Sequence, residues 1–205
     1  MTKEIIPRKT IYRLSQYHRI LQRLQSNDVP TVSSENLAKT AGVKSPQLRK
    51  DLAYFGQMGT RGLGYNVDAL VSRLDQVLGT TRLQPVALIG VGDLGSALLK
   101  YQGFAREGFE IVVGFDLAPN HRHHQGPMPV LPMGDLAREI TERQIKMAIL
   151  TVPATHAQEV TNQLVSAGIQ AILNFAPIIL QVPDQVVVNN VDLALELENL
   201  SYFIR

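Results

Sequence analysis

The sequence predicts an α/β protein made of a small helical unit followed by a parallel sheet with helices on both faces. The first observation is the run Gly90-Val91-Gly92-Asp93-Leu94-Gly95, which joins an apolar strand to a helix. The second is that apolar strands alternate with helices from this run onwards, and the third is helical periodicity over most of the preceding chain. These patterns predict a domain at 1–80, a second at 81–190 and a terminal helix at 191–205.

Composition is that of an ordinary folded protein. Of the 205 residues, 45% are hydrophobic and 19% are charged, which is enough apolar surface for a core in each unit. The absence of cysteine excludes disulfides and thiolate metal ligands. The N-terminal residues lack the apolar region of a signal peptide, and no apolar run is long enough to cross a membrane. We therefore expect a cytoplasmic protein with no membrane partner.

The net charge of +2 is unevenly distributed. Residues 1–80 contain 12 Lys and Arg against 6 Asp and Glu, whereas residues 81–205 contain 8 against 12. A basic unit joined to an acidic one suggests that the first meets a polyanion. A chance imbalance of surface charge is the alternative, so the charge needs a motif to support it.

Three helices are expected before residue 56. Apolar residues recur at spacings of three and four over 10–26, and a second helix with a serine cap is expected over 35–40. Ser45-Pro46 is typical of the cap and the first residue of a third helix over 47–55. Two short helices separated by a tight turn predict a helix-turn-helix, which spans Tyr17 to Phe55.

The third helix carries the candidate DNA-reading side chains. Its apolar residues are expected to face the core, which leaves Gln47, Arg49 and Lys50 outward near its N-terminal end. This end of a recognition helix meets base edges in the major groove. Arg suits a bidentate contact to guanine, Lys suits phosphate or guanine, and Gln suits adenine. A solvated helix face with the same charges is an equally open alternative.

A glycine-rich segment follows the third helix. FGQMGTRGLGYNV has four glycines around Arg61, which predicts short strands joined by a tip, as in the wing of a winged helix. Arg61 would then contact phosphate or enter the minor groove. A flexible linker is the alternative, but the aromatic residues on both sides favour a packed hairpin. A further helix is expected over 66–78.

The run at 90–95 has the context that a Rossmann dinucleotide motif requires, with a strand before it, a helix after it and Asp116 21 residues past its last glycine. Gly90 permits a tight turn, Gly92 allows a pyrophosphate to approach the backbone, and Gly95 allows close packing of the helix on its strand. Asp116 would accept hydrogen bonds from a ribose 2′-hydroxyl and repel the 2′-phosphate of NADP. The motif therefore predicts binding of NADH or NAD+.

Further strands are expected at 146–152, 171–175 and 186–189, with a loop over 118–132. Ligands of such sheets lie outside the carboxyl ends of the strands. The residues expected to line the nicotinamide half of the pocket are Thr151, Val152, Pro153, Asn174, Phe175, Ala176 and Pro177. The histidines of the loop (His121, His123 and His124) have no carboxylate at helical spacing, which favours a solvated loop over a metal site.

The chain ends in an apolar helix over 191–205. Leu193, Leu197, Leu200 and Ile204 form a stripe at helical spacing. Such a helix must bury its stripe, either on its own sheet or on a second subunit. A DNA-binding unit that reads a two-fold operator favours the second subunit.

Four motifs together make the chain resemble the Rex family of redox-sensing transcriptional repressors: SPQLRKDLAYFG, GTRGLGY, GVGDLGSALLKY and NVDLALELENLSYF. The resemblance covers essentially the full chain. It implies a homodimer that binds a palindromic double-stranded DNA operator when NADH is scarce relative to NAD+, and that releases the operator when NADH binds. It also implies a terminal helix exchanged between subunits, lying between the two domains of the partner.

The resemblance also implies roles for two further residues. Tyr101 matches a tyrosine beside the nicotinamide, and Asp192 matches an acidic residue that pairs with that tyrosine in the NAD+ form. Some relatives carry Phe where Leu193 stands and Arg or Asn where Asp93 stands. Packing of Tyr101 in the core is the alternative to its role at the nicotinamide.

The leading hypothesis is therefore a repressor that senses the NADH/NAD+ ratio and has no catalytic residues. A small NAD-dependent dehydrogenase is the runner-up, but about 120 residues of Rossmann unit leave no substrate domain, and His156 has no evident carboxylate partner nearby. A plain NAD-binding module, which would have no affinity for DNA, is the third class.

Overall fold

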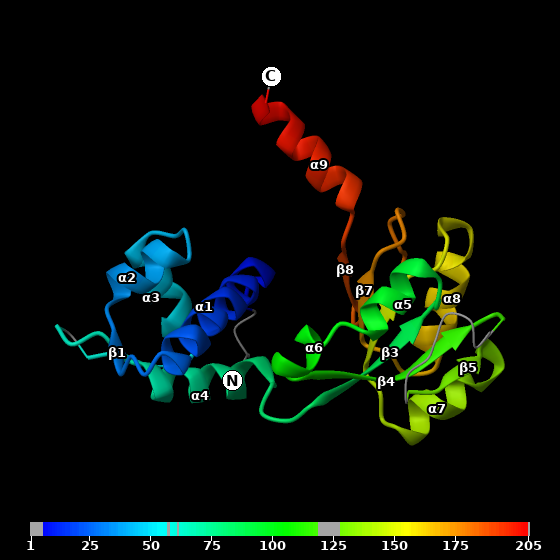
Figure 1. Ribbon diagram of the computed structural model, residues 1–205, viewed down its shortest axis with the longest axis horizontal. Helices are drawn as coiled ribbons and strands as arrows, with labels where there is room; N and C mark the ends of the chain where they lie inside the picture. Colours follow the sequence, from blue (N-terminus) through cyan, green and yellow to red (C-terminus); the bar gives the residue numbers. More distant parts are fainter. Residues whose placement is uncertain (1–5, 57, 61, 119–127, 205) are drawn as a thin grey trace. The chain divides into compact units, whose positions relative to one another are not determined.

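The structure is a computed structural model that describes residues 6–56, 58–60, 62–118 and 128–204. The chain forms two compact units, Met1–Arg82 and Leu83–Arg205, which are described separately below (Figure 1). None of the helices in the described ranges is both long and apolar enough to span a membrane.

The described residues of the N-terminal unit form four helices and two short strands: α1 (Arg8–Ser26), β1 (Thr31–Val32), α2 (Ser34–Thr40), α3 (Ser45–Ala53), β2 (Tyr65–Asn66) and α4 (Val67–Leu78). The amphipathic helices bury one face each in a shared core. Its fully buried residues include Leu14, Leu21, Leu37, Leu48 and Leu74. This core holds α3 against α1 and leaves the other face of α3 exposed.

The boundaries of α3 differ from the expected ones. The helix begins at Ser45, and its N-cap is Lys44, which is extended at φ −80° and ψ 142°. Ser45 is thus the first helical residue rather than the cap, and its hydroxyl donates to the Ser34 hydroxyl at 3.2 Å and accepts from Arg49 at 2.6 Å. The helix ends at Ala53 rather than Phe55, and Gly56 follows with φ +103°, a conformation that stops helical propagation.

The glycine-rich segment folds back on itself, although not with the strands that were expected. Thr60 and Gly64 exchange two backbone hydrogen bonds of 3.0 Å, which closes the tip. The strand β2 pairs in antiparallel fashion with β1, which precedes α2, and not with the residues after α3. Gly64 at φ +81° lies so close to the Val32 backbone that no side chain fits there. Arg61 lies outside the described residues.

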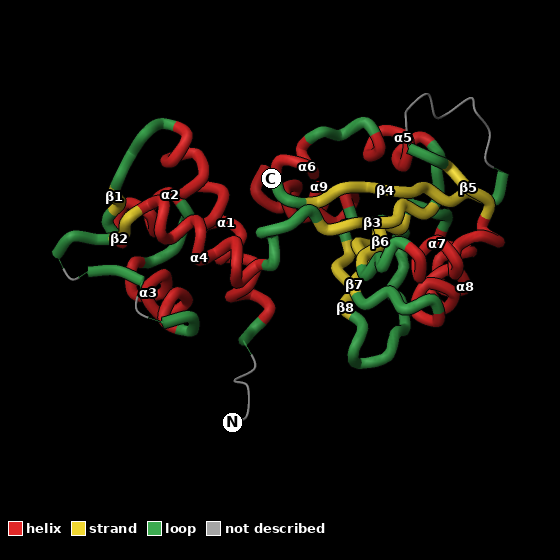
Figure 2. The backbone as a smooth tube through the Cα atoms, turned by 90° about the horizontal axis from the view of Figure 1, so that it is seen from below, coloured by secondary structure: helices red, strands yellow, loops and turns green. Residues whose placement is uncertain are grey.

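The C-terminal unit is built on a six-stranded sheet: β3 (Gln84–Ile89), β4 (Phe109–Asp116), β5 (Val130–Pro132), β6 (Met147–Leu150), β7 (Ala171–Asn174) and β8 (Val187–Asn190). The strand order is β5-β4-β3-β6-β7-β8, and every pair is parallel (Figure 2). This is the doubly wound parallel sheet that the alternating pattern predicts.

Helices cover both faces of this sheet: α5 (Asp93–Leu99), α6 (Gly103–Arg106), α7 (Leu136–Glu142) and α8 (Ala154–Ser166), with the 3₁₀ helix η1 (Met133–Asp135) before α7. Alternate residues of β3 face opposite layers, as the pleat requires. Ala87 and Ile89 pack with α7 and α8, whereas Val86 and Leu88 pack with α5 and α6. Both clusters consist almost entirely of apolar side chains.

Two short elements of this unit were not expected. The strand β5 lies within the stretch predicted as a loop, because three residues beside prolines give too little pattern to detect, while pairing with β4 supplies the backbone hydrogen bonds. The four-residue helix α6 follows α5. The three loop histidines, His121, His123 and His124, lie outside the described residues.

The chain continues from β8 into α9 (Leu193–Ser201) and the 3₁₀ helix η2 (Tyr202–Ile204). Figure 1 shows α9 as a separate helix at the end of β8. Every residue of α9 is exposed, including Leu193, Leu197 and Leu200, which are each more than 60% exposed. The helix therefore does not bury its apolar stripe on its own sheet.

Candidate functional site

Helix α3, the predicted recognition helix, is fixed to α1 by a buried carboxylate. Asp51 is fully buried and accepts two hydrogen bonds from Arg13, at 2.6 Å and 2.7 Å. It also accepts a bond from the Tyr17 hydroxyl at 2.9 Å and one from the Gln47 amide at 2.8 Å. A buried charge is tolerated only when it is paired and hydrogen-bonded in this way.

The network has a clear electrostatic effect. Burial alone raises the pKa of Asp51, but the hydrogen bonds from Arg13, Gln47 and Tyr17 outweigh it and hold this pKa below its ordinary value. Burial, followed by the hydrogen bond to Asp51, raises the pKa of Tyr17 well above its ordinary value. Asp51 is therefore ionised at neutral pH, while Tyr17 stays protonated as a donor.

Gln47 is only partly outward. The side chain is half-buried, and its amide nitrogen donates a hydrogen bond to Asp51 one turn later. Arg49 and Lys50 are exposed, as their positions in the sequence suggest. Arg49 Nη1 donates to the hydroxyl of Ser45 at 2.6 Å and to that of Ser34 at 3.3 Å.

Sequence reasoning missed the Asp51 network. A signal was present, because Asp51 falls between Leu48 and Leu52 on the apolar face of the helix. A carboxylate at such a position requires a partner, but nothing local indicates that the partner is Arg13, which lies 38 residues away.

The glycine-rich loop has the backbone geometry of a dinucleotide site. Gly90 adopts φ +91°, and a side chain there would meet the Thr151 carbonyl oxygen at 2.9 Å. A side chain at Gly95 would overlap the carbonyl oxygen of Gly90, whereas one at Gly92 would meet nothing within 4 Å. The first and last glycines are thus needed for packing, and the middle one faces the open space that a ligand would occupy.

Three other residues of the loop lie around this space. Val91 is buried, whereas Asp93 and Leu94 are exposed in the first turn of α5. Asp116 reaches the loop from the end of β4, and its carboxylate accepts a hydrogen bond from the Val91 amide at 2.7 Å. Its second oxygen accepts from the Ala118 amide at 3.0 Å. The acidic residue and the glycine loop are therefore in direct contact.

Thr151 braces the loop from the end of β6. Its hydroxyl lies 2.7 Å from the Gly90 carbonyl oxygen, to which it donates, and 3.0 Å from that of Ile89. Val152 is half-buried beside Gly90, and Pro153 is exposed at the start of α8. The glycine-rich loop, Asp116 and Thr151 therefore lie together at the carboxyl ends of β3, β4 and β6.

The residues after β7 lie at the same edge of the sheet and have a supporting role. Asn174 is fully buried, and its amide donates to the carbonyl oxygens of Ala176 and Ile178 and to Asn190. The side-chain oxygen of Asn174 accepts a hydrogen bond from the backbone amide of Ala176 at 2.9 Å. Asn174 thus holds the loop after β7, and Phe175 packs in the apolar cluster beside α5 and α6.

Tyr101 is 60% exposed, so the alternative of core packing does not apply. The ring meets Phe104 edge to face with centroids 5.0 Å apart. Asp192 caps α9, and one of its oxygens accepts from the amides of Ala194 and Leu195 at 3.0 Å and 3.1 Å. No hydrogen bond joins Tyr101 to Asp192 within the described chain. Among the described residues, no group of three or more His, Asp or Glu is placed to hold a metal.

The chain is similar to known proteins over both units. A family model described as "Putative DNA-binding protein N-terminus" matches residues 5–53, and one described as "CoA binding domain" matches residues 81–178. A curated redox-sensing transcriptional repressor Rex from Syntrophobacter fumaroxidans is 45% identical over 97% of this chain and 96% of its own length. Its counterpart from Carboxydothermus hydrogenoformans is 44% identical over 98% and 97%.

Solved structures agree with these relatives. A Rex-family repressor called RSP, solved with β-NAD+ and operator DNA, has a TM-score of 0.88 at 38% identity and covers 98% of this chain and 93% of its own. The same repressor in complex with β-NADH has a TM-score of 0.86 at 37% identity, covering 98% and 94%.

A helix-turn-helix unit joined to a Rossmann sheet with a glycine-rich loop defines the class of ligand-responsive DNA-binding regulators. Within that class the assignment is specific. The chain belongs to the Rex family of redox-sensing transcriptional repressors.

Proposed function

We propose that this protein is a cytoplasmic homodimer that represses transcription by binding a palindromic operator at low NADH and that leaves the operator when NADH binds. One observation carries the proposal: Asp116 contacts a glycine-rich loop whose middle glycine faces open space, in the same chain as an exposed basic recognition helix. The relatives solved with β-NADH and with β-NAD+ and operator DNA support it.

In the DNA-bound form, Arg49, Lys50 and the wing residue Arg61 contact the operator, and Gln47 supports the helix through Asp51. The exposure of Arg49 and Lys50 favours this role. Two recognition helices about 34–36 Å apart would fit successive major grooves, which is why a two-fold operator requires a dimer.

The terminal helix supports the proposed dimer. Seven large apolar side chains of α9 and η2 are more than half exposed in the single chain: Leu193, Leu195, Leu197, Leu200, Tyr202, Phe203 and Ile204. A contiguous apolar surface of this kind is typical of a subunit interface. The proposed occupant of that interface is the partner subunit, with each terminal helix exchanged between protomers.

NADH and NAD+ are the proposed regulatory ligands. The loop from Gly90 to Gly95 would hold the pyrophosphate, Asp116 the adenosine ribose, and Tyr101 with the ends of β6 and β7 the nicotinamide. A ligand shifts an equilibrium only through different affinities for its two states. The oxidised ring is cationic and the reduced ring is neutral, so a carboxylate such as Asp192 beside the ring or paired with Tyr101 is where the difference would register.

We propose no catalytic activity for this chain. His156, which follows a strand end, is exposed in the first turn of α8 and makes no hydrogen bond or ion pair with an acidic residue among those described. Turnover of NADH with any simple carbonyl substrate would contradict this part of the proposal.

The proposal is tested by a gel shift on a palindromic operator, with NADH or NAD+ titrated separately. We expect binding without ligand or with NAD+, and release at NADH concentrations that saturate the protein. Tight binding of NADH with no effect on operator affinity would overturn the regulatory mechanism. Absence of binding to any duplex would instead leave an NAD-binding module without a DNA function.

A further inference from the structure

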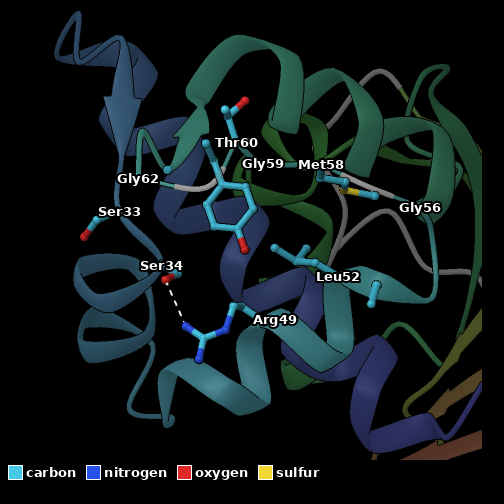
Figure 3. A pocket seen from close by; sticks show the side chains of 12 residues that line it. Ser33, Ser34, Arg49, Leu52, Gly56, Met58, Gly59, Thr60 and Gly62 are labelled. Carbon is cyan, nitrogen blue, oxygen red and sulfur yellow. Dashed lines mark hydrogen bonds between the residues drawn. The ribbon is translucent and has the colours of Figure 1, made fainter.

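A pocket of about 730 Å³ lies within the N-terminal unit, between α3 and the glycine-rich segment (Figure 3). One wall is formed by α3 and the start of α2, and the other by the closed tip and β2. The described lining residues are Ser33, Ser34, Arg49, Leu52, Ala53, Gly56, Met58, Gly59, Thr60, Gly62, Gly64 and Tyr65. Leu52 and Tyr65, which line this pocket, also belong to the apolar core of the unit.

The chemistry of the lining suits an anion. Arg49 is the single charged side chain among the described lining residues, and none of them is Asp or Glu. Hydroxyl groups of Ser33, Ser34, Thr60 and Tyr65 supply the polar surface. Burial raises the pKa of Tyr65, and the nearby positive charge of Arg49 opposes this shift.

Arg49 is held in an orientation that leaves three of its five N–H donors available. Nη1 is bonded to Ser45 at 2.6 Å and to Ser34 at 3.3 Å, and Ser45 donates to Ser34 at 3.2 Å. Figure 3 shows the contact with Ser34. Within the described residues, Nε and Nη2 make no hydrogen bond. This free edge of the guanidinium is the one that forms two parallel bonds to a phosphate.

The glycines keep the pocket open. Gly56 and Gly62 have φ values of +103° and +85°, and a side chain at either would enter space with no atom within 4 Å. A side chain at Gly59 would lie 2.6 Å from the Tyr65 ring and displace it. Side chains at these positions would therefore narrow the space beside Arg49.

A recognition helix enters the major groove and a wing enters the adjacent minor groove, so the strand that separates the two grooves must pass between them. Between α3 and the glycine-rich segment, that space is this pocket. We propose that the pocket receives one backbone phosphodiester of the operator, bound by Arg49 with Ser34 and Tyr65 as its neighbours. The inference rests on the proposed DNA-binding function.

Arg49 and Lys50, which are neighbours on α3, would have different roles at the operator. Arg49 positions the protein on the backbone and carries no sequence information, because phosphates are alike along the duplex. Lys50 is exposed and does not line the pocket, so it remains available for base edges. Ser34 is a positioning residue that acts through Arg49.

The test is a set of operator duplexes in which single phosphates of one half-site are replaced in turn by neutral methylphosphonates. Fluorescence anisotropy measures the affinity of the full-length protein and of Arg49→Gln for each duplex and for a random duplex. Ser34→Ala and Tyr65→Phe probe the neighbours. Lys146→Gln, which removes an exposed charge from the other unit, is the matched control.

We expect one methylphosphonate position that weakens wild-type binding roughly tenfold and that has no further effect on Arg49→Gln. Arg49→Gln should lose affinity equally for operator and random DNA and lower the salt slope by about one per subunit. Ser34→Ala and Tyr65→Phe should lose less DNA affinity than Arg49→Gln, and their loss should depend on the same phosphate. Lys146→Gln should bind with the affinity of the wild type.

Two results would overturn the inference. One is a loss confined to the operator and dependent on base identity, which would make Arg49 a base reader. The other is that the loss of affinity caused by Arg49→Gln adds to the loss caused by each methylphosphonate, whichever phosphate is replaced. In both cases wild-type binding persists, whereas failure of the proposed function is seen separately as absence of wild-type binding to any duplex.

Discussion

Two helices of nine residues, α3 and α9, differ in whether they bury side chains within their own chain. The recognition helix α3 buries Leu48, Asp51 and Leu52 within its own unit. The terminal helix α9 buries none of its residues within the chain. Isolated helices of this length are marginal in water, so each must draw its stability from contacts with something else.

The difference concerns where those contacts lie. Contacts with α1 fix α3 before DNA is present, and the Asp51 network orients the helix as well as anchoring it. In the proposed dimer, the contacts of α9 come from the second subunit. If α3 reads the operator and α9 responds to the ligand, as proposed, α3 benefits from preorganisation and α9 must be free to change partners.

The largest expected effect follows from removing the anchor of α3. Asp51→Ala leaves the Arg13 guanidinium and the Tyr17 hydroxyl without their partner. We expect a loss of about 3 kcal/mol in the free energy of unfolding of the N-terminal unit, because breaking one side of a buried pair leaves an uncompensated polar group. Chemical denaturation followed by circular dichroism measures it. Asp68→Ala, an exposed carboxylate on α4, should cost only a fraction of this.

The same network predicts sensitivity to acid. The pKa of Asp51 is lowered in the folded protein from its ordinary value of 3.8, so its stabilising contribution is fully present above that value. The contribution is lost as pH falls further, through the folded pKa. Stability of wild type should therefore decline below about pH 4 more steeply than that of Asp51→Asn, and parallel pH profiles would contradict the assigned ionisation state.

The next effect concerns the partner of α9. Leu197→Ala removes an apolar side chain that is 68% exposed in the single chain but buried in the proposed dimer. We expect dimer affinity to fall by about 2 kcal/mol for each buried copy, with the fold of the monomer unchanged. Sedimentation velocity over a concentration series measures the shift. Ile179→Ala, an exposed residue outside α9, serves as the control, and an undiminished dimer in Leu197→Ala would place the interface elsewhere.

These two helices also show what a sequence can reveal. The spacing of Gly90, Gly92, Gly95 and Asp116 predicted the loop correctly because its geometry depends on local backbone and one adjacent strand. The exposed stripe of α9 was readable from its periodicity. The anchor of α3 was not, because Arg13 and Asp51 meet only through the packing of α1 on α3.

A similar reason explains the revised roles of Gln47 and Asn174. Both are polar residues at positions where ligands bind in related folds, so their types favoured a binding role. Their actual hydrogen-bond partners, Asp51 and the loop after Asn174, depend on side-chain orientation. The strand β5 was missed because its pairing with β4, rather than its own residues, defines it.

A smaller effect tests whether the dinucleotide loop is preorganised as α3 is. Thr151→Val keeps the shape of the side chain but removes the hydroxyl that donates to the carbonyls of Ile89 and Gly90. We expect the affinities for NADH and NAD+ to weaken together by about 1 kcal/mol, roughly fivefold. The reason is that the Thr151 hydroxyl is hydrogen-bonded to the loop and not to the nicotinamide. Isothermal titration calorimetry measures both affinities. Thr151→Ser should retain them, and a loss for one ligand only would place Thr151 at the ring itself.

The smallest effect separates two roles of one residue at the start of α9. Asp192 caps the helix through the amides of Ala194 and Leu195, and the same carboxylate is the proposed partner of Tyr101. Asp192→Asn keeps the cap, because asparagine caps as well as aspartate, but removes the charge. We expect it to leave dimer affinity unchanged and to weaken binding of the cationic NAD+ more than that of NADH, which raises the ratio of the NAD+ to the NADH dissociation constant.

Asp192→Ala removes both roles, so it should raise the ratio equally and also weaken the dimer by about 1 kcal/mol through the lost cap. Calorimetry measures the ligand ratio, and sedimentation measures the dimer. If Asp192→Asn left the ratio at its wild-type value while Asp192→Ala weakened the dimer, the carboxylate would be a helix cap alone. In that case α9 would respond to the nicotinamide through another residue. The apolar residues that α9 leaves exposed in the single chain would then function in dimerisation and not in ligand sensing.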